Sequence, residues 1–424
     1  MKILIVCSWG LPHVGGVSTY VDQLRKGLER EGHHVDLFCP TPDGQSYYVP
    51  SQSFVLEKNK IAPIISERAN LFFDQYLPGL DPWIRTSEID RYCLEIAAAS
   101  WGLKQYDIIH AQDIISAHAI SRVKPPGVAL VTTMHGCLAM EWFVKLKEMG
   151  IPEQDRSSLL WHYSASREYI GATSSEFTIT PSNWLKQLLI KDFQVPAHHL
   201  MVAPYGIDVD HLKQTVQNSS NITKPLGKKV ILCSARFDVV KGHVHLLHAL
   251  GKLAAERKDW VCWLAGDGAL ANELKQLSQS LGLDQQVVFL GNRADVPALL
   301  KMADLFVLPS LQDNQPLAVM EAQIAGKPVL VSDAGGIPEM VADRLTGLIS
   351  EAGNHEQLYQ HLKMTLDNPG LCSHLGYHAQ VWSSKYWSLS AMTERNTRIY
   401  KRAIQINSQR SESKNVRTAG MGGD

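Results

Sequence analysis

The chain has 424 residues, which is too long for one ordinary hydrophobic core and predicts two or more domains. Its apolar content of 45% is typical of a packed globular protein, and its net charge of -1 speaks against a nucleic-acid-binding surface. No stretch approaches the length of a membrane span, and the apolar opening segment is far too short for a signal peptide. The seven cysteines never show metal-ligand spacing and suit a reducing compartment. These features predict a cytoplasmic protein.

The first half of the chain alternates strands and helices. A strand over residues 2–7 is followed by a glycine-containing loop and by a helix over residues 17–31, whose apolar residues recur at helical spacing. Residues 41–83 are mixed in period and receive no assignment. This alternation favours a parallel, doubly wound α/β sheet. The further expected elements are strands at 35–39, 107–110, 128–134 and 176–180 and helices at 94–103 and 184–190.

The second half repeats the βα alternation more regularly. The expected strands cover residues 230–235, 260–265, 287–290, 305–308 and 328–332, and the helices 243–256, 269–281, 296–302, a segment that holds Glu321, and 382–404. A polar stretch before this half reads as a linker. The expected organisation is an N-terminal domain at 1–208, a linker at 209–228, a C-terminal domain at 229–383, a helix at 384–406 and a disordered tail at 407–424.

One short segment, residues 310–322, places two carboxylates and a helix start together. It follows an apolar run that ends at a proline, as a buried strand would. Asn314 or Gln315 can cap a helix that begins at Pro316, so Asp313 lies in the loop and Glu321 just over one turn into the helix. Both acids would face a crevice at the carboxyl ends of parallel strands, where such sheets bind ligands. The alternative is that Asp313 is a cap and Glu321 a solvated acid.

Two cations follow the first strand of the second half. Arg236 supplies a planar fork for phosphate oxygens, and Lys241 supplies a compact point charge. With a helix starting close behind them, they are well placed for a diphosphate. A solvated surface pair is the alternative. In the first half, Gly15 and Gly16 can bring backbone amides near an anion or form an ordinary turn.

His135 ends a strand and precedes a glycine, where it can hydrogen-bond a sugar hydroxyl or be a satisfied core histidine.

The spacing of residues disfavours two other kinds of site, a dinucleotide site and a metal site. The glycines after the first strand do not make the dinucleotide-binding fingerprint. Metal is a minor alternative at Asp208 and Asp210, which fit helix caps, and in the run that begins at His243, where neighbouring histidines point to different faces.

Several different short motifs follow one another along nearly the whole chain, to about residue 400, and their order and spacing are specific. They are Gly15-Gly-Val-Ser-Thr-Tyr-Val21, Thr133-Met-His-Gly136, Pro204-Tyr-Gly-Ile-Asp208, Arg236 with Lys241-Gly242, Ala265-Gly-Asp-Gly268, Phe289-Leu-Gly291, the segment from Asp313 to Glu321, Gly335-Gly-Ile-Pro-Glu339 and Thr346-Gly347. In this combination they resemble the family 4 retaining glycosyltransferases, two-domain enzymes of the GT-B type.

The resemblance implies two doubly wound Rossmann-like domains that face a central cleft, with the C-terminal helix crossing back to the N-terminal domain. The first domain would bind the acceptor, and the second would bind a nucleotide-activated sugar. Arg236 and Lys241 would grip the donor diphosphate, helped by amides near Leu317 and by Gly15 and Gly16. Fixed cations and helix amides would balance the charge on the leaving diphosphate, so the family needs no metal and no cofactor beyond the donor.

The resemblance also assigns the sugar and nucleoside contacts. Glu321 would bind the ribose hydroxyls, and the backbone from Gly291 to Arg293 would lie near the base. His135 would touch the donor sugar beside the reacting carbon. Catalytic roles therefore fall to His135 and Asp313, together with Arg236 and Lys241.

The chain departs from the family pattern at Asp313, where glutamate is usual, and in the Asn-Gln-Pro that follows, where Gly-Phe-Gly is common. Aspartate is one methylene shorter, so its reach to the sugar hydroxyls changes and the donor sugar is left open. A carboxylate nucleophile for the far side of the sugar is not evident, which favours front-face attack assisted by the leaving phosphate.

The sequence thus predicts a retaining transferase that moves a hexose-type residue from a UDP- or GDP-sugar to an acceptor hydroxyl. Two alternatives stay open: a sugar-nucleotide epimerase of the same fold and a non-catalytic nucleotide-sugar-binding module. The acceptor, whether a glycan, a lipid-linked glycan or a small molecule, is not predicted. Apolar and aromatic residues between 54 and 101 fit either a buried core or a surface for peripheral membrane contact.

Overall fold

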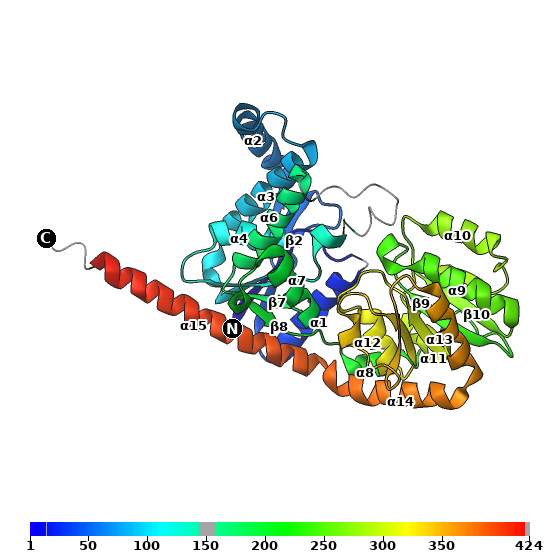
Figure 1. Cartoon of the computed structure of the whole chain (residues 1–424). Helices are drawn as coiled ribbons and strands as arrows, with labels where there is room; N and C mark the ends of the chain where they lie inside the picture. The colour runs from blue at the N-terminus through cyan, green and yellow to red at the C-terminus, as the bar shows by residue number, and fades with distance from the viewer. Residues whose placement is uncertain (14, 142, 144–155, 157, 420–424) are drawn as a thin grey trace. The chain divides into compact units, whose positions relative to one another are not determined.

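The computed structural model describes residues 1–13, 15–141, 143, 156 and 158–419, with side chains up to residue 410. The chain divides into two compact units (Figure 1). Unit 1 is formed by Met1–Ala139, Gln154–Pro204 and the segment from Met392 onward, and unit 2 mainly by Tyr205–Ala391. Each unit is built on one sheet with helices against it. The prediction of two doubly wound α/β domains is confirmed.

Unit 1 has an eight-stranded sheet in the described residues, in the order β4-β3-β2-β1-β5-β6-β7-β8. All neighbouring strands pair parallel except β2 with β3 and β3 with β4. The strands are β1 Lys2–Val6, β2 His34–Pro40, β3 Ser46–Val49, β4 Phe54–Glu57, β5 Ile108–Ala111, β6 Ala129–Thr133, β7 Phe177–Thr180 and β8 Leu200–Val202. Strands β1, β5, β6 and β7 are buried along almost their whole length, as expected for a parallel sheet covered on both faces.

The helices of unit 1 follow from amphipathic stripes and side-chain caps. Helix α1 buries Tyr20, Val21, Leu24 and Leu28 at helical spacing. Asp81 caps the N-terminus of α3 by accepting hydrogen bonds from the backbone amides of residues 83 and 84. The helices are α1 Gly16–Arg30, α2 Ala62–Tyr76, α3 Pro82–Trp101, α4 Ile114–Val123, α6 Leu159–Thr173, α7 Asn183–Phe193 and α15 Leu389–Ala419, with 3₁₀ turns η1 Lys58–Lys60, η2 Leu103–Gln105 and η3 Ala197–His199.

Unit 2 has a six-stranded sheet in the described residues, in the order β11-β10-β9-β12-β13-β14, and every pair in it is parallel. The strands are β9 Lys229–Ser234, β10 Trp260–Ala265, β11 Val287–Gly291, β12 Leu305–Leu308, β13 Val329–Ser332 and β14 Gly347–Ser350. The helices are α8 Val209–Thr215, α9 His243–Glu256, α10 Ala271–Ser280, α11 Val296–Met302, α12 Leu317–Ile324, α13 His355–Asp367 and α14 Pro369–Tyr386, with 3₁₀ turns η4 Val239–Lys241 and η5 Ile337–Glu339.

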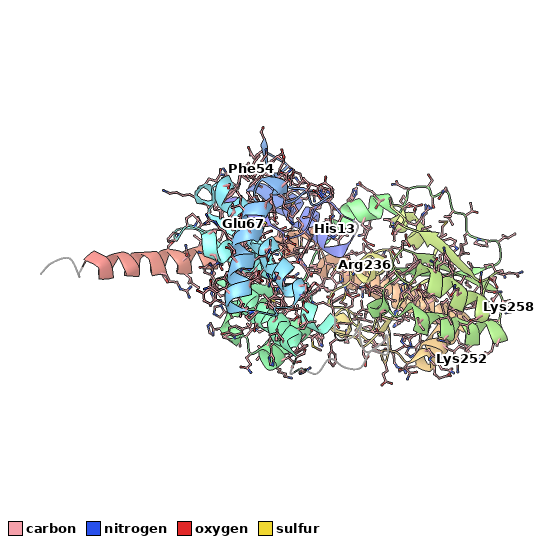
Figure 2. All side chains as sticks on the ribbon, turned by 90° about the horizontal axis from the view of Figure 1, so that it is seen from above. His13, Phe54, Glu67, Arg236, Lys252 and Lys258 are labelled. Carbon is pink, nitrogen blue, oxygen red and sulfur yellow. The ribbon has the colours of Figure 1, made fainter. Side chains whose placement is uncertain are left out.

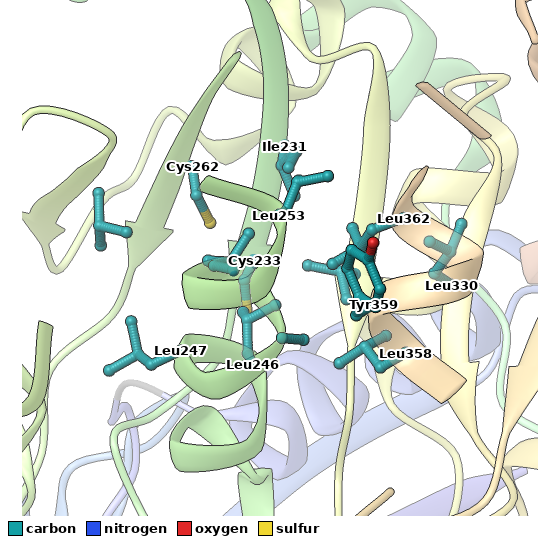
Figure 3. Close-up of a cluster of buried hydrophobic side chains, with 14 of the residues drawn as sticks. Ile231, Cys233, Leu246, Leu247, Leu253, Cys262, Leu330, Leu358, Tyr359 and Leu362 are labelled. Atoms are coloured by element: carbon teal, nitrogen blue, oxygen red, sulfur yellow. The ribbon is translucent and has the colours of Figure 1, made fainter. Parts of the chain in front are cut away.

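The core of unit 2 lies between this sheet and helices α9 and α13 (Figure 3). Ile231 and Cys233 project from β9 toward Leu246 and Leu253 of α9, and Leu358 projects from α13. All of these side chains are buried, and six of the seven cysteines are buried free thiols. The cysteines therefore act as small core residues, as their positions in apolar runs predicted.

The structure differs from the sequence-based assignments at the domain joints. Residues 209–215, expected in a linker, form helix α8, which packs on α11 and α12 within unit 2. The single helix expected at 384–406 is two helices, since α14 ends at Tyr386 and α15 begins at Leu389. Residues 407–419, expected to be disordered, continue α15. The unassigned residues 41–83 contain β3, β4, η1, α2 and the start of α3.

A buried polar network ties α15 to the sheet of unit 1. The His110 ring on β5 hydrogen-bonds the Tyr400 hydroxyl at 2.6 Å and the Thr133 hydroxyl at 2.7 Å. Burial lowers the pKa of His110 to about 3, so the neutral ring donates at one nitrogen and accepts at the other. The helix is thereby fixed to β5 and, through Thr133, to β6.

This network predicts the effect of Tyr400→Phe. The substitution leaves one nitrogen of the buried His110 ring without its partner, so the free energy of unfolding should fall by about 1–3 kcal/mol in urea denaturation. The matched change Tyr377→Phe, at a side chain 64% exposed on α14, should alter it by no more than about 0.5 kcal/mol. Equal stabilities for the two variants would show that the network does not hold α15.

Candidate active site

The strand order of unit 2 reverses between β9 and β12. The chain moves outward from β9 to β10 and β11 and then returns to pair β12 on the other side of β9. The loops that follow β9 and β12 therefore leave the same edge of the sheet side by side. In open parallel α/β sheets, ligands bind outside the carboxyl ends of the strands at such a point. The predicted residues Arg236, Lys241 and Asp313 all lie in these two loops.

Close backbone packing locks the two loops together. The backbone N–H of Leu311 donates to the carbonyl of Val240 at 2.8 Å. Gly242 has a φ of +69°, and a Cβ there would lie 1.9 Å from the carbonyl oxygen of Pro309. Gly335, in the loop after β13, has a φ of +61°, and a Cβ there would lie 1.9 Å from the carbonyl oxygen of Asp313. Only glycine fits such backbone positions, so Gly242 sets how closely the loops after β9 and β12 meet, and Gly335 sets how closely the loop after β13 approaches Asp313.

An ion pair joins the loops at their centre. The Lys241 ammonium lies 2.5 Å from Oδ2 of Asp313, and both side chains are mostly covered, at 17% and 13% exposure. The Ser310 hydroxyl donates to the same oxygen at 3.3 Å, and the backbone N–H of Asn314 donates to Oδ1 at 3.0 Å. Asp313 is therefore held by three donors and in turn positions Lys241.

Arg236 follows the end of β9 and is exposed. In the described part of the chain, its guanidinium has no ion-pair or hydrogen-bond partner, while the neighbouring Phe237 N–H donates to the carbonyl of Asp267 and anchors the backbone. Figure 2 shows Arg236 and Lys258 at opposite ends of unit 2. A charged fork on a fixed backbone at a ligand-binding edge is suited to an anion.

Helix α12 begins one residue later than predicted. Its first residue is Leu317 and its N-cap is Pro316, so neither Asn314 nor Gln315 caps it. Instead, Oε1 of Gln315 accepts a hydrogen bond from the backbone N–H of Tyr205 at 2.7 Å, because the side chain is turned into the protein. The first turn of α12 carries neither a side-chain cap nor an acid. Its backbone amides therefore remain available to an anion at this edge.

Glu321 lies in the second turn of α12 and is half-buried. Burial raises the pKa of its carboxyl from 4.5 to about 7, and among the described residues the carboxyl has no hydrogen-bond partner. Near neutral pH it is therefore present both as the carboxylic acid and as the carboxylate. A group of this kind can accept from or donate to a ligand hydroxyl.

Gly291 and Arg293 lie at the carboxyl end of β11, two strands from β9. The separation is about 10 Å at the usual strand spacing. The Arg293 guanidinium is occupied by the carboxylate of Asp295, at 2.6 and 2.7 Å, and by Asn221. The Arg293 side chain is thus already engaged, and the carbonyl of Gly291 accepts from the backbone N–H of Gly266 at 2.8 Å.

Unit 1 carries its predicted residues at the carboxyl edge of its own sheet. Gly15 and Gly16 open α1 after β1, and His135 follows β6. Nε2 of His135 lies 3.3 Å from Oε1 of Gln112, and its ring packs edge-on against Tyr20 at 4.9 Å. Burial lowers the pKa of His135 to about 3, so the ring is neutral near pH 7. It can make hydrogen bonds but carries no charge.

The metal alternatives receive no support. Asp208 caps α8, since its side chain accepts from the backbone N–H of His211 at 3.2 Å. His243 is buried with its ring against Phe237 and its Nε2 3.8 Å from the Cys233 sulfur. Throughout the described ranges, no three or more His, Cys, Asp or Glu side chains gather closely enough to hold a metal ion.

Sequence reasoning missed the residues that support the predicted ones. Ser310 holds Asp313, and Tyr20 and Gln112 contact His135. Ser310 was detectable, because it stands three residues before the acid in the same loop. Tyr20 and Gln112 come from other elements, so only the fold brings them to His135.

Comparison with known proteins adds the family. A model described as "Glycosyltransferase Family 4" matches residues 14–211, and one described as "Glycosyl transferases group 1" matches residues 216–382. Together these two models span both units. The chain belongs to the glycosyltransferases of the family 4 type.

Glycosyltransferases from other organisms match this chain along nearly its full length. An uncharacterised glycosyltransferase of Methanocaldococcus jannaschii is 25% identical over 96% of this chain and 99% of its own. The MMP alpha-(1->4)-mannosyltransferase of Mycolicibacterium hassiacum is 25% identical over 95% of this chain and 98% of its own. The chain is therefore similar to these enzymes from end to end.

Solved structures assign the fold of this glycosyltransferase to GT-B. Sucrose-phosphate synthase from Thermosynechococcus elongatus matches with a TM-score of 0.73 and 17% identity, over 96% of this chain and 100% of that one. Anabaena HepE, solved with UDP-glucose, matches with a TM-score of 0.63 and 19% identity, over 95% of this chain and 99% of that one. The predicted GT-B fold is thereby confirmed.

The close approach at Gly335 predicts a large effect of Gly335→Ala. Gly335 and Gly282 have nearly the same φ, +61° and +66°, but Gly282 has no atom within 4 Å of the position of a Cβ. Gly282→Ala should cost only the left-handed backbone penalty of about 1–2 kcal/mol in urea denaturation. Gly335→Ala should cost about 1–3 kcal/mol more, because the loop of Asp313 must move. Equal losses would contradict the importance of this approach.

The raised pKa of Glu321 predicts a pH dependence of stability. Its carboxyl holds a proton more tightly in the folded state, so the stability it contributes is complete below pH 4.5 and is lost as the pH rises through about 7. The difference in unfolding free energy between the wild type and Glu321→Gln should fall across this range. Urea denaturation in a pH series measures it, and a difference independent of pH would rule out the raised pKa.

Proposed function

We propose that the chain transfers a hexose-type sugar from a nucleoside diphosphate sugar, with UDP or GDP as the carrier, to an acceptor hydroxyl with retention of configuration. The observation that carries this proposal is the pair of cations at the switch point of unit 2. Arg236 has no protein partner in the described residues, and Lys241 pairs only with Asp313. The solved relative with UDP-glucose and the mannosyltransferase relative fit a donor of this class.

The diphosphate is proposed to lie across the β9 and β12 loops. Arg236 supplies two parallel N–H donors, and Lys241 supplies a charge that is already positioned by Asp313. The uncapped amides at the start of α12, near Leu317, add donors and the positive end of the helix dipole. Glu321, five residues after the N-cap of α12, is then available for the ribose hydroxyls. The backbone at Gly291 is proposed to contact the base.

These groups stabilise the leaving group in the proposed reaction. The bond between C1 of the sugar and the phosphate oxygen breaks, and negative charge develops on the diphosphate. The acceptor oxygen forms a bond to C1 on the same face, and its proton passes to an oxygen of the leaving phosphate. Because Arg236 and Lys241 are aimed at that charge before the reaction, no reorganisation is required.

Asp313 is proposed to act as a positioning group and as a contact to a sugar hydroxyl, rather than as a nucleophile. All of its donors lie within its own loop and on Lys241. A phosphate that takes Lys241 would release Oδ2 for a hydroxyl of the sugar. The neutral ring of His135 and the amides of Gly15 and Gly16 keep the donor-binding roles that the resemblance implies, as part of the proposal.

Arg236→Ala tests the proposal directly. Turnover should fall by about two to three orders of magnitude, the usual cost of removing one group that stabilises transition-state charge. Folding should persist, because the Arg236 side chain is exposed. Lys258→Ala is the matched control, since Lys258 lies at the opposite end of unit 2 and should leave turnover unchanged (Figure 2). Near-normal activity of Arg236→Ala would overturn the diphosphate site.

The assay also separates the alternatives. Incubation with UDP- and GDP-sugars, with slow donor hydrolysis as the readout, needs no acceptor. An epimerase would change the donor sugar without releasing the nucleoside diphosphate, and a binding module would leave the donor intact. With an acceptor in hand, NMR of the product should show the anomeric configuration of the donor. Loss of activity after chelation would contradict the proposed independence from metal.

A further inference from the structure

Gln112 and His135 are brought together by neighbouring strands of unit 1. Gln112 is the residue after β5, and His135 comes two residues after β6. The two strands pair in parallel with Ala111 beside Thr132, so their carboxyl ends lie next to each other. Oε1 of Gln112 lies 3.3 Å from Nε2 of His135, within hydrogen-bond distance. The fold thus places a fully buried amide beside the ring that the proposed function assigns to the donor sugar.

Gln112 is itself held in one orientation. Its backbone N–H donates to the carbonyl of Val6 at 2.8 Å, which ties the residue to β1. Its side-chain Nε2 donates to the carbonyl of His110 at 3.4 Å. Turning the amide over would bring its oxygen against that carbonyl oxygen, and two acceptors that face each other repel. The amide oxygen of Gln112 therefore faces His135.

This orientation of the amide decides which nitrogen of the His135 ring carries the proton. An amide oxygen accepts hydrogen bonds and cannot donate, so the ring nitrogen that faces it must donate. Burial lowers the pKa of the ring to about 3, so the ring is neutral near pH 7. A neutral imidazole has one N–H, and its other nitrogen keeps a lone pair. Nε2 therefore bears the proton, and Nδ1 is the acceptor.

Tyr20 restrains the plane of the same ring. The two rings meet edge-on, with 4.9 Å between their centroids and an angle of 71° between their planes. Tyr20 lies on α1 and is buried at 1% exposure, so the surface it offers is fixed. Rotation of the imidazole about its bond to Cβ would disturb this contact and break the hydrogen bond to Gln112. The ring is therefore held from two elements, α1 and the end of β5.

We propose that Gln112 is a positioning residue that keeps His135 in the tautomer with the proton on Nε2. This inference rests on the proposed function, in which His135 contacts the donor sugar. With Nε2 committed to Gln112, the ring can only accept at Nδ1, so a sugar hydroxyl that meets it at a nitrogen must donate. The other tautomer would present an N–H at that position, and the hydroxyl would have to accept. Gln112 thus sets the direction of the hydrogen bond between the ring and the sugar.

NMR of the full chain, labelled with ¹⁵N-histidine, tests the tautomer without any assay of activity. Among the 17 histidines, the ring signals of His135 are those lost in His135→Gln. In the wild type, the ring proton should be on Nε2. Gln112→Met keeps nearly the length and volume of the side chain but removes the amide. It should shift the ratio of the two tautomers by about fivefold or more toward Nδ1–H, the equivalent of one net hydrogen bond.

A second variant separates hydrogen bonding from packing. Gln112→Glu should keep the proton on Nε2, because a carboxyl oxygen accepts from the ring whether the group is ionised or protonated. The matched control is Gln286→Met, at a glutamine 7% exposed beside the amino end of β11 in unit 2. It should leave the tautomer of His135 unchanged. Circular dichroism of each variant confirms that the chain is folded.

Donor hydrolysis is the second readout. Gln112→Met should turn over the donor about five to ten times more slowly, the rate equivalent of one net hydrogen bond, and Gln286→Met should match the wild type. A wild-type proton on Nδ1 of His135 would overturn the proposal. So would a Gln112→Met variant with the tautomer or the turnover of the wild type. If the wild type consumed no nucleotide sugar, the proposed transferase function would fail, and the NMR spectra alone would decide whether Gln112 sets the tautomer.

Discussion

The ion pair between Lys241 and Asp313 is the interaction on which the candidate site depends. It joins the loop after β9 to the loop after β12, at the point in the sheet of unit 2 where the strand order reverses. The pair is mostly covered, so its attraction is less screened than that of a surface pair. Gly242 permits the backbones of these two loops to come this close. The fold thus brings Lys241 and Asp313 together at this edge of the sheet.

This arrangement leaves the site with unequal charges. The charge of Lys241 is balanced by Asp313, whereas Arg236 has no partner in the described residues. Burial raises the pKa of the Glu321 carboxyl to about 7, so this group carries only part of a negative charge near neutral pH. The Arg236 guanidinium and the uncapped start of α12 are therefore donors for an anion at this edge. A dianionic diphosphate is a ligand that such an edge favours. The shorter aspartate at position 313 still reaches Lys241.

Much of the fold was predictable because apolar periodicity and burial coincide. Helix α9, strand β10 and helix α11 have the bounds that their apolar patterns predicted. Residues 41–83 could not be assigned for a physical reason. Strands β3 and β4 have only four residues each, and α2 is apolar on a buried and on an exposed face, so no single period dominates.

Other differences arise from contacts distant in sequence. Gln315 has the position of a helix cap but is used by the backbone of Tyr205, 110 residues away. The break between α14 and α15 occurs at Trp387, whose indole donates to Gln323 and whose carbonyl accepts from Ile207. Neither contact leaves a local signal. Arg236, Lys241 and Asp313 stand out in the sequence by residue type and position, whereas the pairing of Lys241 with Asp313 required the fold.

A crystal structure of the full chain with a nucleoside diphosphate tests the central claim most directly. The account predicts the β-phosphate within hydrogen-bond distance of both Arg236 and Lys241, with the Lys241 ammonium moved from Asp313 toward the phosphate. A diphosphate bound elsewhere, with the pair of Lys241 and Asp313 still intact, would contradict it.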